Sequence, residues 1–167
     1  MRIRSLLPGL VLAPFLAMTL AGTTVQAGEP AVSGNYADTS AYLQSDADID
    51  AWFTLVFSLK DGFDQICGDT FCEGEYSNIE SLRYRCSVDQ DSGRIGMCVW
   101  VFAASDEQID PATGRIAVHR QFWRCRTPLL LGTTIQQLLV ALQGDSPLYA
   151  PLPGSDKSIF DGLIDCL

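Results

Sequence analysis

The residues with the clearest chemical potential in this chain are its six cysteines, an even set suited to disulfides or to metal binding. Structural zinc sites use paired Cys-x-x-Cys units or histidine ligands. Here Cys67 and Cys72 are separated by four residues, and His119 is the only histidine. This ligand supply disfavours zinc and predicts three disulfides, which require an oxidising compartment. The cysteines concerned are Cys67, Cys72, Cys86, Cys98, Cys125 and Cys166.

Catalytic patterns are scarce. A nucleophile is usually activated by a histidine, and the alternation around His119 predicts a partly buried, structural position for it. No serine lies in a Gly-x-Ser-x-Gly elbow, and no glycine-rich phosphate loop is present. Carboxylates are plentiful, so a small carboxylate-dependent hydrolase stays open as an alternative, because such pairs form in space. We therefore predict no catalytic residue and no cofactor.

An acidic loop over residues 64–75 is a candidate calcium-binding site. Calcium needs several oxygen ligands that converge in one loop, and the order here does not match the helix–loop–helix template. A solvated acidic loop explains the same residues more simply, so we predict no metal site.

The N-terminus has the pattern of an export signal. Arg2 and Arg4 precede an apolar stretch, and Val25-Gln26-Ala27 fits the small-x-small cleavage rule. We predict a cleaved signal peptide over residues 1–27, a flexible N-terminal segment over 28–44 and a single domain over 45–167. The product would be periplasmic or secreted, with no membrane anchor after cleavage.

The charge of the chain narrows the classes of partner. The formal net charge is −9, and removal of the leader, which holds Arg2 and Arg4 and no acids, makes the product more acidic. Such a surface repels nucleic acids and anionic membranes. It suits a protein partner, and a basic protein is one candidate.

The elements that would position these residues can be read from periodicity. Ser45 and the aspartates after it predict the start of a helix, whose apolar residues include Trp52, Phe53 and Phe63. Alternating or apolar runs predict three strands, at 81–88, 95–104 and 116–127, joined by turns that contain Gly93 and Gly114. Capping patterns at Thr133 and Ser158 predict two C-terminal helices.

A trial register connects the strands. If the first hairpin closes around Ser92, Cys86 faces Cys98; if Asp110 faces Arg115 in the second, Trp100 faces Cys125. Cys125–Cys166 and Cys67–Cys72 are then the favoured remaining pairs. One face carries Leu82, Tyr84 and the aromatic residues of the later strands, and we expect it to be the core. The opposite face carries Arg83, Arg85, Val99, Val101, Arg124 and Arg126.

The predicted fold is therefore a disulfide-stabilised α+β two-layer sandwich: a helix, a three-stranded antiparallel meander and two helices. Arginines on apolar ground are typical of interfaces, although these arginines could equally pair with the chain's own carboxylates. The predicted function is that of an exported, non-catalytic binding protein. It would bind a protein partner as an inhibitor or immunity protein of a bacterial periplasm. A structural accessory of an envelope assembly is a further alternative.

Overall fold

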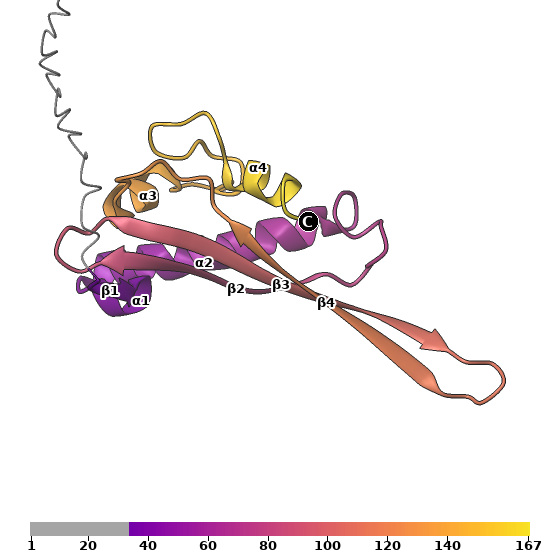
Figure 1. Ribbon diagram of the computed structural model, residues 1–167. Coiled ribbons are helices and arrows are strands. Elements are labelled where there is room, and N and C mark those ends of the chain that lie inside the picture. The colour runs from indigo at the N-terminus through magenta and orange to yellow at the C-terminus, as the bar shows by residue number, and fades with distance from the viewer. Residues whose placement is uncertain (1–33) are drawn as a thin grey trace, which may run out of the picture. The chain divides into compact units, whose positions relative to one another are not determined.

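A computed structural model describes residues 34–167 of the chain, so the predicted signal peptide over 1–27 lies outside the described residues. The described part is an α+β domain with one antiparallel sheet of strand order β1-β2-β3-β4 and with four helices (Figure 1). No helix within residues 34–167 is long and apolar enough to cross a membrane.

The first two elements lie where the sequence predicted a flexible segment. β1, Tyr36–Asp38, pairs with the end of β2, and α1, Thr39–Tyr42, follows directly. Asp38 caps α1 by accepting a hydrogen bond from the backbone of Ser40 at 3.0 Å. Buried Thr39 donates from its hydroxyl to the carbonyl of Cys86 at 3.2 Å. The sheet thus has four strands rather than the predicted three, because these polar contacts hold a segment with few apolar residues.

The long helix α2, Asp46–Cys67, begins as predicted. The side chain of Ser45 accepts from the backbone of Asp48 at 3.1 Å, and Asp46 and Asp48 occupy the first turn, where negative charge is favourable. Trp52 and Phe63 face the sheet, whereas Phe53 is exposed, contrary to its predicted place in the buried stripe.

The three main strands are β2, Glu80–Asp89, β3, Ile95–Ile109, and β4, Ile116–Arg126. Their pairing follows both trial registers, with Cys86 opposite Cys98 and Trp100 opposite Cys125. A bulge lies between Ser81 and Arg83. It turns Leu82 out to 55% exposure, so the predicted core position of Leu82 is wrong.

The bulge also changes which residue of β2 enters the core. Ser81 is buried instead of Leu82, and it accepts a hydrogen bond at 2.8 Å from the indole nitrogen of Trp100. A buried indole N–H needs such an acceptor, and a leucine at this position could not supply one.

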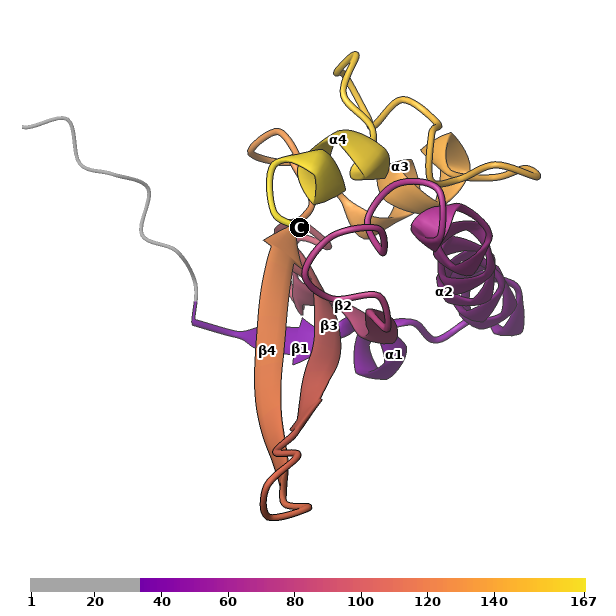
Figure 2. The ribbon, with the colours of Figure 1, turned by 90° about the vertical axis from the view of Figure 1, so that its right-hand side faces the viewer.

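Two short helices complete the chain: α3, Ile135–Ala141, and α4, Ile159–Ile164. The capping box of α3 is formed by Thr134 and Gln137, one residue later than predicted, and that of α4 by Ser158 and Asp161, as predicted. Figure 2 shows α2 and α3 on the same side of the sheet.

The core lies between this side of the sheet and the helices. Phe63 of α2 contacts Trp100 and Phe102 of β3, with ring centroids 5.8 Å and 4.7 Å apart. Disulfides join Cys67 to Cys72, Cys86 to Cys98 and Cys125 to Cys166, the pairs that the sequence favoured.

The ends of β3 and β4 form a hairpin that extends past the rest of the described residues (Figure 1). All side chains from Glu107 to Arg120 are exposed. His119 is among them, opposite Asp106 in the register. The predicted partly buried position of His119 is therefore wrong, because the strand continues beyond the helices that would have covered it.

Candidate functional site

The six residues predicted for binding form a regular array on the sheet face opposite the core. Strand pairing places Arg83, Val101 and Arg124 in one row across β2, β3 and β4. Arg85, Val99 and Arg126 form the next row. We call this array the arginine face: Arg83, Arg85, Val99, Val101, Arg124 and Arg126.

The geometry of the array follows from ordinary sheet dimensions. Adjacent strands lie about 4.8 Å apart, so the two arginines of a row are separated by roughly 10 Å, with a valine between them. Neighbouring rows are two residues apart, or about 7 Å. All four arginines are exposed and both valines are partly buried.

The two rows differ in how far their charges are already neutralised. Within residues 34–167, Arg83 and Arg124 form no ion pair. In the other row, the Arg126 guanidinium lies 3.9 Å from the Met97 sulfur. Arg85 Nε donates to Asp38 Oδ2 at 2.6 Å. The row of Arg83 and Arg124 therefore has the larger uncompensated charge.

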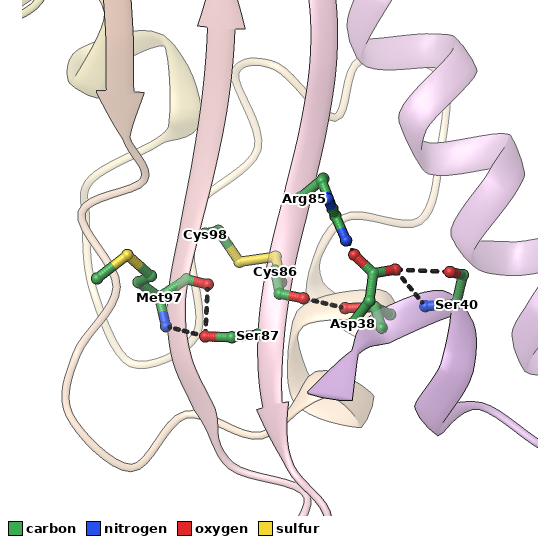
Figure 3. A network of polar contacts seen from close by, with 8 residues as sticks. Asp38, Ser40, Arg85, Cys86, Ser87, Met97 and Cys98 are labelled. Atoms are coloured by element: carbon green, nitrogen blue, oxygen red, sulfur yellow. Dashed lines mark hydrogen bonds and ion pairs between the residues drawn. A yellow bond between two sulfur atoms is a disulfide. The ribbon is translucent and has the colours of Figure 1, made fainter. Parts of the chain in front are cut away.

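Asp38 is held at the border of this face by a small polar network (Figure 3). Its Oδ1 accepts from the Ser40 hydroxyl at 2.6 Å and from the Ser40 backbone at 3.0 Å. Burial acts to raise the pKa of Asp38, but the hydrogen bonds from Ser40 and Arg85 outweigh it and bring the pKa below its usual value. Asp38 is thus charged near neutral pH and offsets the charge of Arg85.

A shallow pocket of about 330 Å³ adjoins the network. Arg85 and Val99 of the arginine face line it together with Tyr36, Asp38 and Met97. It offers an apolar floor with one charged pair at its side, which could seat a small side chain of a partner.

Three exposed apolar residues border the arginine face and were not among the predicted site residues. They are Leu82 at 55%, Met97 at 44% and Phe122 at 58% exposure. Strand alternation places Met97 and Phe122 on this face, so extending the trial register would have found them. Leu82 could not be found in this way, because the bulge reverses its side.

Together these residues give the face the composition of an interface: arginine beside exposed aromatic, methionine and aliphatic side chains. Such a cluster differs from scattered surface leucines, which need no explanation. The arrangement can bind carboxylates through the guanidinium groups and apolar side chains between them.

Within 34–167, no three of the His, Cys, Asp and Glu side chains converge in a way that could hold a metal ion. A pocket of about 140 Å³ beside α2 is lined by Asp61 and Asp145. Asp61 accepts a hydrogen bond from Gln65 at 2.7 Å, and no hydrogen bond joins the two aspartates.

Comparison of the chain with protein-family models, with curated proteins and with solved structures found no match.

Proposed function

We propose that this chain is an exported, non-catalytic binding protein of the inhibitor or immunity type, and that its arginine face binds a protein partner. The observation that supports this most is that Arg83 and Arg124, on either side of Val101, form no ion pair within residues 34–167. A guanidinium group binds a carboxylate through two parallel hydrogen bonds, and such charge-assisted contacts are about twice as strong as neutral ones.

The three disulfides are consistent with the export part of this proposal, since an oxidising compartment allows disulfides to form and persist. The contact surface of the partner would carry acidic groups and apolar side chains. A basic partner would instead meet the carboxylates elsewhere on this acidic chain, and it would leave the arginine face uncovered.

Site-specific photo-crosslinking in the native host can identify the partner and place it on the molecule. A photoreactive amino acid at Phe122, beside the arginine face, should form a covalent adduct with the partner. The matched position is Phe57 on α2, a phenylalanine with 72% exposure away from this face. An adduct formed only from position 57 would place the partner elsewhere.

The affinity for that purified partner then tests the role of the charges. Arg83→Ser combined with Arg124→Ser should weaken binding by about tenfold or more, since each charge-assisted bond contributes about 1.5–3 kcal/mol. The control combines Arg94→Ser with Lys157→Ser, which removes the same charge from exposed positions outside the face. Equal affinities of the two double variants, both folded by near-UV circular dichroism, would contradict the proposal.

A further inference from the structure

Within residues 34–167, no strand pairs with the outer edge of β4, which lies directly beside the arginine face. β4 is the last strand in the order β1-β2-β3-β4, and it pairs with β3 without a register shift. It contains no proline and no lysine. Proteins usually protect a long edge strand with such residues or with a bulge, because unpaired backbone groups recruit other strands.

Two hydrogen bonds establish which residues of β4 point their backbone groups at this edge. Arg115 accepts from the Asp110 backbone at 2.9 Å, and Thr127 donates to the Cys98 carbonyl at 3.1 Å. In an antiparallel ladder, every second residue bonds to the same neighbour. Odd-numbered residues of β4 therefore bond to β3, and even-numbered residues present their N–H and C=O groups to the free edge.

The opposite edge of the hairpin supports this assignment. There the odd-numbered residues of β3 point outward, and the Ser105 N–H indeed donates to the side-chain oxygen of Asn78 at 3.1 Å. Asn78 thus occupies that edge just before β2 begins. On β4, α4 closes only the last position, since a Cβ on Gly162 would lie 2.8 Å from the Arg126 carbonyl oxygen. The open part of the edge runs from Ile116 to Arg124.

The same even-numbered residues carry their side chains on the outer face. They are apolar or cationic, and the two kinds alternate from Val118 onward: Ile116, Val118, Arg120, Phe122 and Arg124. Ile116, Val118 and Phe122 are 62%, 54% and 58% exposed. Arg120 and Arg124 have no ion pair within residues 34–167. A strand added here would place its own side chains about 5 Å from these, one opposite each.

The charges distinguish between two kinds of added strand. A second copy of this chain, paired through β4 in a symmetric antiparallel manner, would gather the arginines of both copies on one face. In a pair centred on Arg120 or on Phe122, arginines would lie directly opposite each other, and like charges in that position are destabilising. A strand with carboxylates opposite Arg120 and Arg124, and with apolar residues opposite Val118 and Phe122, would match each of these four side chains.

We propose that the partner binds by strand addition. It would contribute an extended segment in which acidic and apolar residues alternate on one side, and this segment would pair with the backbone of β4 between Val118 and Arg124. This inference rests on the proposed binding function, and it adds the mode of recognition and the sequence pattern of the partner. Main-chain bonds would provide affinity, and the arginines would select an acidic sequence.

A synthetic peptide can test the proposal without the natural partner. The probe has nine residues, with valine and glutamate alternating at its odd positions and threonine at its even positions. Added to the full chain, it should slow amide hydrogen exchange at Val118, Arg120, Phe122 and Arg124, as measured by NMR. The control peptide has lysine in place of glutamate and should bind at least about tenfold more weakly, through loss of the charge-assisted bonds.

A matched pair of variants isolates the backbone contribution. Val118→Pro removes an N–H that points away from β3, so the sheet should tolerate it. Val118→Ala shortens the side chain but keeps the N–H. The proline variant should bind the acidic peptide roughly tenfold more weakly than the alanine variant, through loss of the bond and obstruction by the ring.

Three results would overturn strand addition. The first is binding without amide protection and with equal affinity for both Val118 variants. The second is the absence of any preference for the acidic peptide. The third is protection of the same amides without peptide in a protein that sediments as a dimer, which would assign the edge to a second copy. A further outcome separates the two proposals. If Arg83→Ser with Arg124→Ser weakens binding of the partner identified by crosslinking, but Val118→Pro does not, the arginine face is the binding site and strand addition is wrong.

Discussion

At the scale of single residues, Asp38 sets the charge distribution of the arginine face. It caps α1 and pairs with Arg85, so one carboxylate both orders the N-terminal segment and neutralises one arginine. Arg83 and Arg124 have no such neighbour within the described residues. The charge available to a partner is therefore concentrated in one row of the array rather than spread over all four arginines.

Asp38→Asn separates the two roles of this residue, because asparagine caps a helix as well as aspartate does but carries no charge. We expect the variant to lose about 0.5–1 kcal/mol of unfolding free energy at pH 7, a modest value because the Arg85 side chain is 55% exposed. Urea denaturation would measure the loss.

The pH dependence of this difference follows from the lowered pKa of Asp38. Its stabilising contribution is complete above the usual carboxyl value of 3.8 and is lost as the pH falls through the lower folded-state value. Wild type and variant should therefore converge in acid. Asp156→Asn, at an exposed turn, is the control and should change stability little. A difference between wild type and Asp38→Asn that persists below the folded-state pKa would show that the charge is not responsible.

At the scale of elements, the contact between α4 and the end of β4 is unusually close. A Cβ placed on Gly162 would lie 2.8 Å from the Arg126 carbonyl oxygen and 2.9 Å from Pro128 Cδ. Neither group belongs to a flexible side chain that could move away. Glycine at this position lets the helix approach the strand, and the helix then covers the last backbone group of the sheet edge.

Gly162→Ala should consequently destabilise the protein by about 1–3 kcal/mol, the usual cost of overpacking. Gly62→Ala is the matched control in α2, where the new Cβ would lie 3.7 Å from Leu148, an ordinary contact. That change should be neutral or stabilising by up to about 1 kcal/mol, since alanine is the better helix former. Chemical denaturation of both variants tests the contact, and equal effects would argue against it.

At the scale of the whole described domain, the three disulfides cross-link different parts of the structure. One closes the loop after α2, one joins β2 to β3, and the third ties α4 to β4. The third spans 41 residues of sequence, against 5 for the first. Of the three disulfides, it is the one that cross-links the C-terminal segment to the sheet.

Chain entropy predicts unequal consequences when the disulfides are removed. Cys125→Ala with Cys166→Ala should cost about 4 kcal/mol, and Cys67→Ala with Cys72→Ala about 2 kcal/mol, because the longer loop restricts the unfolded chain more. Thermal unfolding under non-reducing conditions would rank the two variants. The reverse order would mean that native packing, rather than loop closure, determines their contributions.

The sequence by itself determined the features that depend on local period and local chemistry. Alternation along the strands placed Cys86 opposite Cys98 and brought the six residues of the arginine face to one side. Ser45 and Ser158 marked helix starts because a capping side chain acts within one turn. These inferences succeed because a strand has a period of two and a helix end has unsatisfied N–H groups, whatever surrounds them.

Only the tertiary structure decided which side chains are buried and which segments pair with another element. The bulge exposes Leu82 and buries Ser81 against Trp100, and the hairpin carries His119 beyond the helices. β1 forms because Thr39 and Asp38 find partners on β2, far away in sequence. The open edge of β4 has the same origin. Local sequence determines the direction of a side chain, but burial and pairing depend on what the rest of the chain places beside it.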